Sequence, residues 1–171
     1  MQEKGYQFAT ICSSNVNRSM EAHSLFKKNH LRVCSYGTGR KIKIPGLSEK
    51  KPLEYGFGTE YETILNDLIE LNKDFFTERE IIPMIQRDKG VKKAPQRFQD
   101  EFDLSFIDVC ICFDEHVFDS VVEELQFRGC SKIKPIFVFN IHVKDRVSTA
   151  REGAKHALRL AEMVWMEWVA E

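Results

Sequence analysis

The stretch FATICSSNVNRSMEAH, residues 8–23, places a cysteine at the end of an apolar run and an arginine just before a helical pattern. Residues 6–12 have the composition of a buried strand, and residues 19–29 that of a helix. Residues 31–37 read as a second short strand that ends in the glycine-bearing turn GTGR. Strand, helix and strand in such close succession are typical of a βαβ unit with parallel strands. The stretch therefore predicts an α/β fold.

The rest of the chain continues this pattern. Further strands are predicted at 106–113 and 134–143, and helices at 59–77, 79–88, 117–127 and 148–169. We expect a three-layer α/β sandwich with a central, mainly parallel, four-stranded sheet. Residues 38–105 form a helical insertion between the second and third strands, which begins with a turn-rich, basic segment at 37–58. Right-handed crossovers place the carboxyl ends of all strands at one edge, where open α/β sheets bind ligands.

Length and composition limit the classes of protein to consider. The chain has 171 residues, 43% of them hydrophobic and 30% charged, which predicts a single folded domain over 1–171. A formal net charge of -1 argues against binding to nucleic acid through bulk charge. No apolar run approaches the length of about 18 residues that a membrane helix needs, and the N-terminus lacks the apolar core of a signal peptide. We expect a cytosolic or nuclear protein with no membrane contact.

The cysteines do not suggest a disulfide framework or a metal site. There are five of them, an odd count in what we take to be a reducing compartment. Cys110 and Cys112 have C-x-C spacing inside the apolar run FIDVCICF, but no second close pair of Cys or His residues accompanies them. We interpret both as buried thiols of a core strand, and we expect neither a metal nor a cofactor.

The loop between the first strand and the first helix has the features of an anion site. The first N–H groups of a helix lack internal partners and carry partial positive charge, so they attract phosphate. Arg18 can bind two phosphate oxygens at once, and the same positive field favours the thiolate form of Cys12. Asn15 and Asn17 tolerate left-handed backbone, and the hydroxyl of Ser19 can hydrogen-bond the thiolate. The competing interpretation is a buried cysteine followed by a surface arginine.

A thiolate that displaces an alkoxide from phosphate also needs a proton donor at the same edge of the sheet. Asp114 and Glu115 follow the third strand, and Asp145 follows the fourth on a loop long enough to lean over the pocket. His142 is a rival because histidine titrates near neutrality. Asp103 and Asp108 lie before and inside a strand, where they are poorer candidates.

Several motifs resemble one known family. CSSNVNRSMEAH (12–23), SYGTG (35–39), YGFGTEY (55–61) and PQRFQD (95–100) are similar to the RNA polymerase II C-terminal-domain phosphatases, and further matches extend over nearly the whole chain. That family belongs to the low-molecular-weight tyrosine-phosphatase superfamily and removes phosphate from the serine at heptad position five. His142 and Val16 depart from the family pattern, since the first position is commonly acidic and the second commonly polar.

The resemblance implies a role for each residue of the loop. Cys12 would be the nucleophile that becomes phosphocysteine, Arg18 the phosphate clamp, and Asp145 the acid and base. The implied phosphate-binding residues are Ser13, Ser14, Asn15, Val16, Asn17, Arg18 and Ser19. The family recognises a cis phosphoserine-proline bond, which implies substrate contacts at Gly37, Thr38, Gly39, Lys43, Pro45 and Met84.

The resemblance also implies a setting: a nuclear enzyme of transcription and mRNA 3′-end processing, acting on the phosphorylated polymerase tail beside a scaffold protein of the cleavage-and-polyadenylation machinery. Three alternatives remain open. They are a low-molecular-weight tyrosine phosphatase, a thiol-based arsenate reductase and a non-catalytic phosphopeptide-binding module. Against the first, KDRV (144–147) lacks the Asp-Pro that such tyrosine phosphatases usually carry.

Overall fold

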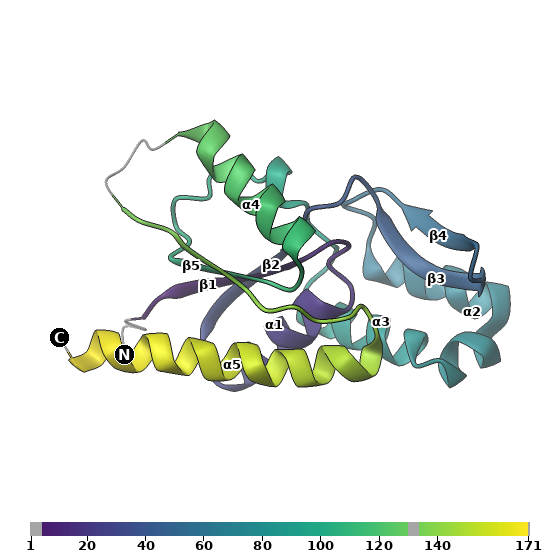
Figure 1. The fold of residues 1–171 in the computed structure, drawn as a ribbon. Coiled ribbons are helices and arrows are strands. Elements are labelled where there is room, and N and C mark those ends of the chain that lie inside the picture. The colour runs from purple at the N-terminus through teal and green to yellow at the C-terminus, as the bar shows by residue number, and fades with distance from the viewer. Residues whose placement is uncertain (1–4, 130–133, 171) are drawn as a thin grey trace.

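The computed structural model describes residues 5–129 and 134–170, and of residues 168 and 169 the backbone alone (Figure 1). Its strands are β1 (Gln7–Cys12), β2 (Arg32–Gly37), β3 (Ile42–Ser48), β4 (Lys51–Tyr55), β5 (Val109–Cys112) and β6 (Phe137–Asn140). Its helices are α1 (Arg18–Lys28), α2 (Tyr61–Glu78), α3 (Ile81–Val91), α4 (Glu115–Arg128) and α5 (Val147–Ala170), with a short 3-10 turn, η1 (Phe98–Asp100).

The central sheet has the order β2-β1-β5-β6, and every pair in it is parallel. Cys12 is in register with Gly37 of β2, while Cys112, the last residue of β5, is in register with Asn140 of β6. The four strands therefore end at one edge of the sheet. The predicted four-stranded parallel sheet is confirmed, although β5 and β6 are shorter than the ranges 106–113 and 134–143.

Helices cover both faces of this sheet, as predicted for a three-layer sandwich (Figure 1). Alternate strand residues face opposite layers, so Phe8 packs with α1 and α5 while Ile11 packs with α4. The inner face of α5 carries small residues, which lets it lie close to α1. These buried residues are Ala150, Ala154, Ala157 and Ala161. None of the helices in the described ranges is both long and apolar enough to cross a membrane.

The insertion differs from its prediction in one respect. Part of the segment at 37–58, expected to be turn-rich, forms the antiparallel hairpin β3–β4, with Ile42 opposite Tyr55. Ile42 and Ile44 are fully buried against α2 and α3, while Lys43 between them is exposed. This burial outweighs the turn preference of Pro45 and Gly46, which lie where the hairpin register shifts. The helical part of the insertion, α2 and α3, is confirmed.

Cys110 and Cys112 lie in the core between the sheet and α4, as predicted for structural thiols. Both are completely buried, and burial is the main cause that raises the pKa of each thiol above its ordinary value. They are therefore neutral at physiological pH.

Candidate active site

The loop that joins β1 to α1 lies at the edge where the parallel strands end (Figure 1). Cys12 ends β1 and is only 3% exposed, and Arg18 begins α1 with 5% of its surface exposed. Residues 13–17 connect the two in a curve without regular secondary structure. The predicted strand–loop–helix arrangement thus places a nearly buried sulfur and a nearly buried guanidinium on the same loop.

The sulfur of Cys12 lies 3.0 Å from the hydroxyl oxygen of Ser19. That oxygen accepts a hydrogen bond of 2.9 Å from the side-chain amide of Asn15. A hydroxyl is both a donor and an acceptor, so Ser19 can accept from the thiol of Cys12 and donate to its thiolate. The trio can therefore stabilise a thiolate by a charge-assisted hydrogen bond.

Asn15 holds the middle of the loop in an unusual backbone conformation. Its φ of 57° is left-handed, a region that asparagine adopts more readily than most residues. Its carbonyl oxygen accepts a 2.6 Å hydrogen bond from the hydroxyl of Tyr61, and its side-chain oxygen accepts one of 3.0 Å from the backbone N–H of Gln96. Both partners come from the insertion, and neither was predicted, because nothing in the sequence links them to residue 15.

The segment after β2 supports the loop from below. The backbone N–H of Thr38 donates to the carbonyl of Cys12, and that of Gly39 to the carbonyl of Ser13, both at 3.0 Å. A Cβ atom on Gly37 would lie 2.6 Å from the Ser13 oxygen, so no larger residue fits there without a shift. The three residues that the resemblance assigns to substrate, Gly37, Thr38 and Gly39, are thus in contact with the loop or directly beneath it.

Arg18 is oriented by acceptors on the loops that follow β5 and β6. One terminal nitrogen donates to the carboxylate of Asp114 at 2.8 Å and to the carbonyl of Val143 at 3.0 Å. Its Nε is buried, makes no hydrogen bond, and lies 3.5 Å from a carboxylate oxygen of Asp145. Burial alone lowers the pKa of Arg18, but the negative charges of Cys12, Asp145 and Asp114 outweigh it and raise the pKa overall. A permanent cation with a buried unused donor suits an anionic ligand.

Two candidates for the proton donor, Asp114 and Asp145, differ in the hydrogen bonds that their carboxylate oxygens already accept. Asp114 has both oxygens engaged, one by Arg18 and the other by the backbone N–H of Val117, so that it caps α4. Asp145 is 60% exposed at its side chain, and one of its oxygens accepts from the amide of Asn17 at 2.9 Å. Asp145 therefore lies at the mouth of the site with the freer carboxylate.

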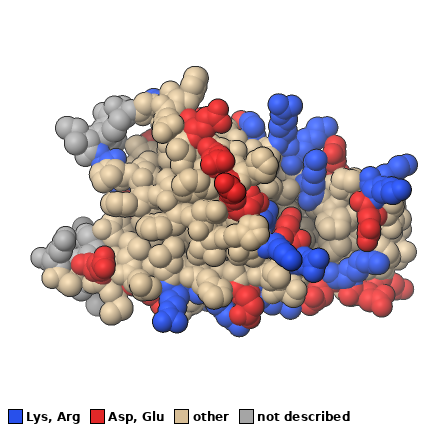
Figure 2. Space-filling view, in the orientation of Figure 1, with Lys and Arg blue, Asp and Glu red and all other residues tan. Residues whose placement is uncertain are grey.

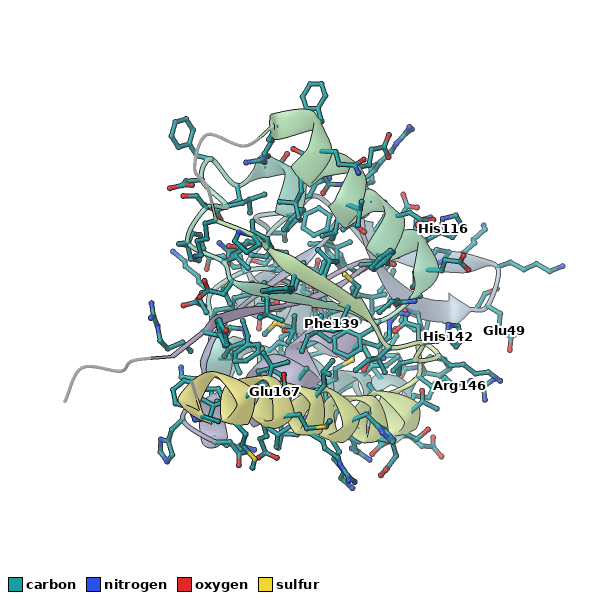
Figure 3. All side chains as sticks on the ribbon, turned by 60° about the vertical axis from the view of Figure 1, so that its left-hand side comes forward. Glu49, His116, Phe139, His142, Arg146 and Glu167 are labelled. Carbon is teal, nitrogen blue, oxygen red and sulfur yellow. The ribbon has the colours of Figure 1, made fainter. Side chains whose placement is uncertain are left out.

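The rival His142 is exposed on the loop after β6, and Figure 3 shows it with Arg146 at the end of the molecule where the strands stop. Its place on the same loop as Asp145 keeps it near the site, but within the described residues no hydrogen bond joins it to residues 12–18.

A cavity of about 330 Å³ opens beside the loop and is lined by four segments of the chain, one of them the loop itself. Three residues that the resemblance assigns to substrate or phosphate, Pro45, Met84 and Val16, provide apolar lining. Lys43, Asn17 and Asp145 provide polar lining, and the backbone N–H of Lys43 donates to the hydroxyl oxygen of Ser14 at 3.0 Å. The structure thus brings together residues that lie far apart in the sequence.

Arg87 of α3 contacts the loop and was not predicted. Its guanidinium donates to the carbonyl of Val16 at 3.0 Å and pairs with Glu21 of α1. It also makes two hydrogen bonds, of 2.7 and 3.0 Å, to one oxygen of the fully buried Asp88. Arg87 therefore joins α3, α1 and the loop between β1 and α1. Among the described residues, no group of three or more His, Cys, Asp and Glu side chains is arranged to hold a metal ion.

Comparison with known proteins places these features in a family. A family model described as "Ssu72-like protein" matches residues 6–168. SSU72 of Xenopus laevis, named as a phosphatase of the RNA polymerase II C-terminal domain, is 40% identical over 85% of this chain and 74% of its own. SSU72 of Danio rerio, which carries the same name, is 42% identical with the same coverage.

Solved structures agree with this relationship. The serine phosphatase of the RNA polymerase II C-terminal domain from Drosophila melanogaster superposes with a TM-score of 0.88 at 38% identity, covering 92% of this chain and 82% of that one. A D. melanogaster Ssu72 with Symplekin, bound to a cis peptidomimetic phosphopeptide of that domain, has a TM-score of 0.84 at 36% identity over 93% of this chain and 80% of that one. The resemblance predicted from the motifs is confirmed, and the chain belongs to the Ssu72-like family.

Proposed function

We propose that this chain is a single-domain, cysteine-dependent phosphatase that acts on phosphoserine-proline sites in the heptad repeats of the RNA polymerase II C-terminal domain. The observation that carries the proposal is the loop geometry: the sulfur of Cys12 lies 3.0 Å from Ser19, and the unused Nε of Arg18 is buried on the same loop. Relatives about 40% identical are named as phosphatases of that domain, which supports the same reaction and substrate for this chain.

In the first step, the thiolate of Cys12 attacks the phosphorus atom of the phosphoserine. A sulfur–phosphorus bond forms while the bond between phosphorus and the serine oxygen breaks, and protonated Asp145 gives its proton to that leaving oxygen. The amides of residues 13–18 and the guanidinium of Arg18 hold the oxygens of the transferred group, where charge is concentrated in the transition state.

In the second step, a water molecule attacks the phosphorus of phosphocysteine, and the carboxylate of Asp145 takes its proton. The sulfur–phosphorus bond breaks to release inorganic phosphate, and the hydroxyl of Ser19 stabilises the returning thiolate. One carboxyl group thus serves as acid and then as base. No step needs a cofactor.

The substrate lies against the cavity beside the loop. Pro45 and Met84 offer an apolar surface to the proline ring that follows the phosphoserine, and Lys43 provides a cation at the rim. Gly37, Thr38 and Gly39 shape the floor on which the phosphate loop rests. A cis proline bond folds the peptide back on itself, which suits a compact cavity of about 330 Å³.

The cellular setting follows from the substrate. We place the chain in the nucleus, in transcription and mRNA 3′-end processing, with the cytoplasm as a further location. The Drosophila relative forms a complex with Symplekin, which supports a scaffold protein of this kind as a partner. Direct binding to nucleic acid or membranes is not part of the proposal.

The test compares kcat/KM on heptad phosphopeptides that carry phosphate at position two, five or seven, with a phosphotyrosine peptide as reference. We expect a preference of about tenfold or more for position five, a difference of about 1.4 kcal/mol in transition-state binding. Activity should survive chelators, because the nucleophile is a protein thiol, and should be lost with vanadate or thiol alkylation. A preference for phosphotyrosine would replace this proposal with a tyrosine phosphatase.

A further inference from the structure

Arg79, which directly follows α2, is a cation that packs on an aromatic ring and has no ion-pair partner among the described residues. Its guanidinium carbon lies 3.8 Å from the centre of the Phe75 ring, in a cation–π contact. The residue is exposed, and no carboxylate of the described chain lies within ion-pair distance of it. The ring holds the guanidinium in place without neutralising it, so its five donors remain available.

Two cavities meet at this arginine. One is the cavity of about 330 Å³ beside the phosphate loop, and the other, of about 430 Å³, lies along the β3–β4 hairpin. Lys43, Pro45, Arg79 and Asp145 line both of them. A peptide that leaves the phosphate loop along the hairpin therefore passes Arg79.

The charges around this junction favour an anion. Lys43 lies 4.0 Å from Glu54, at the limit of an ion pair, and Arg146 lines the inner cavity. Of the two acids that line the cavities, Asp145 has one oxygen bound by Asn17, and this oxygen lies 3.5 Å from Nε of Arg18, which offsets its charge. The other, Glu49, lies at the exposed tip of the hairpin (Figure 3). In Figure 2, the half of the molecule that carries this hairpin has many Lys and Arg side chains, with Asp and Glu side chains among them.

We propose that Arg79, together with Lys43, forms a second anion subsite that binds a phosphate or carboxylate group on the substrate peptide, close to the phosphoserine being hydrolysed. The inference rests on the proposed function, because it assumes a phosphopeptide in the cleft. A cavity of 330 Å³ is about 9 Å across if roughly spherical, the length of two to three extended residues. The second anion is thus two or three residues from the scissile phosphoserine.

The experiment measures kcat/KM on heptad peptides phosphorylated at position five alone, at two and five, and at five and seven. In a parallel set, glutamate replaces the second phosphoserine, which separates a doubly phosphorylated substrate from an acidic one. The quantity compared is the ratio of each value to that of the singly phosphorylated peptide, so that a general loss of activity cancels. We expect a ratio of about three to ten for at least one peptide, because an exposed guanidinium–phosphate pair is modest in strength, and a fall in this ratio as salt is raised.

Arg79→Gln should bring the ratio to about one, and Arg79→Lys should restore part of it. Arg159→Gln is the matched control, since Arg159 is an exposed arginine of α5, about 18 Å along that helix from its start near the site. Two results would overturn the subsite. In the first, the unmodified protein gives a kcat/KM ratio of one for every doubly anionic peptide. In the second, the ratio is unchanged in Arg79→Gln.

Failure of the proposed function gives a different result, namely no hydrolysis of any heptad peptide. In that case the dissociation constants of the singly and doubly anionic peptides are compared in the Cys12→Ser protein, which can bind peptide without turnover. Equal dissociation constants for singly and doubly anionic peptides overturn the subsite there as well.

Discussion

At the scale of single residues, the surroundings of Cys12 are a hydrogen-bonded trio with Ser19 and Asn15. Asn15 donates to the oxygen of Ser19, which lies 3.0 Å from the sulfur, and the hydroxyl of Ser19 can donate to a thiolate there. Cys12→Ser should reduce turnover by more than about a thousandfold, because the hydroxyl is a far weaker nucleophile than the thiolate. Phosphopeptide binding, measured by fluorescence anisotropy, should persist because the loop amides and Arg18 remain. Cys34→Ser, at a half-buried cysteine of β2, is the control, and full activity of Cys12→Ser would sink the mechanism.

Asp145 is the second residue whose role depends on local surroundings. Its exposed carboxyl rests on Asn17 near Arg18, whereas Asp114 has both oxygens engaged. Asp145→Asn should lower kcat by about 10²–10⁴, the usual contribution of a positioned acid or base. Asp119→Asn, at an exposed residue of α4, should leave kcat unchanged. If Asp145→Asn keeps its kcat while His142→Gln loses it, the proton donor is His142.

At the scale of elements, the phosphate loop depends on contacts with α3. Arg87 donates to the carbonyl of Val16 and pairs with the buried Asp88. Burial raises the pKa of Asp88 to about 8, so its carboxyl is largely protonated at neutral pH. Arg87→Met should destabilise the fold by about 1–3 kcal/mol, because the buried carboxyl loses its hydrogen-bond donor. The double variant Arg87→Met with Asp88→Leu removes that buried carboxyl as well.

We therefore expect the double variant to recover much of the stability while kcat/KM stays reduced, because the loop carbonyl of Val16 still lacks its donor. Denaturant unfolding and phosphopeptide kinetics on the same samples separate the two effects. Recovery of both quantities together would show that Arg87 acts on stability alone.

The hairpin shows why elements are harder to predict than the sheet. Ile42, Lys43 and Ile44 alternate with the period of a strand, and this signal was present in the sequence. Pro45 and Gly46 follow at once and indicate a turn, so the local signals conflict. Burial of both isoleucines against α2 and α3 decides in favour of the strand.

At the scale of the whole molecule, a buried histidine links acidity to stability. His23 of α1 is 8% exposed, and its Nδ1 lies 2.8 Å from the hydroxyl oxygen of Ser35 on β2. Burial, with smaller effects of Lys92 and Lys27, lowers the pKa of His23 to about 4. The unfolded chain therefore takes up a proton near pH 6.5, before the folded chain does.

Stability from this group is complete above about pH 6.5 and is lost as the pH falls toward 4, since the unfolded state binds more protons in that window. By pH 5 the loss should be about 2 kcal/mol. The measurement is the free energy of unfolding of the natural protein and of His23→Gln at pH 7.5 and at pH 5.0. The difference between the two proteins should be smaller at pH 5.0 by this amount. His156→Gln, at an exposed residue of α5, should show no such change, and a constant gap for His23→Gln would contradict the assignment.

Local patterns were sufficient to predict the architecture and the strand–loop–helix arrangement around residues 12–18. The parallel sheet was predicted from three patterns: the apolar run before Cys12, the helical period after Arg18 and the later strand patterns. These patterns are readable because they involve near neighbours in the chain. The loop motif is contiguous, so its residues are readable together, and the family resemblance drawn from it is confirmed.

Only the tertiary structure brought distant segments to that loop. The contacts of Tyr61 and Gln96 with Asn15, and of Arg87 with Val16, join residues more than 45 positions apart. Arg79 lines the same two cavities as Lys43 and Asp145, which come from other segments of the chain. Such contacts depend on how the insertion packs onto the sheet edge. Hydrophobic burial sets that packing and carries no fixed spacing along the chain, so a single sequence does not reveal which polar side chains it brings together.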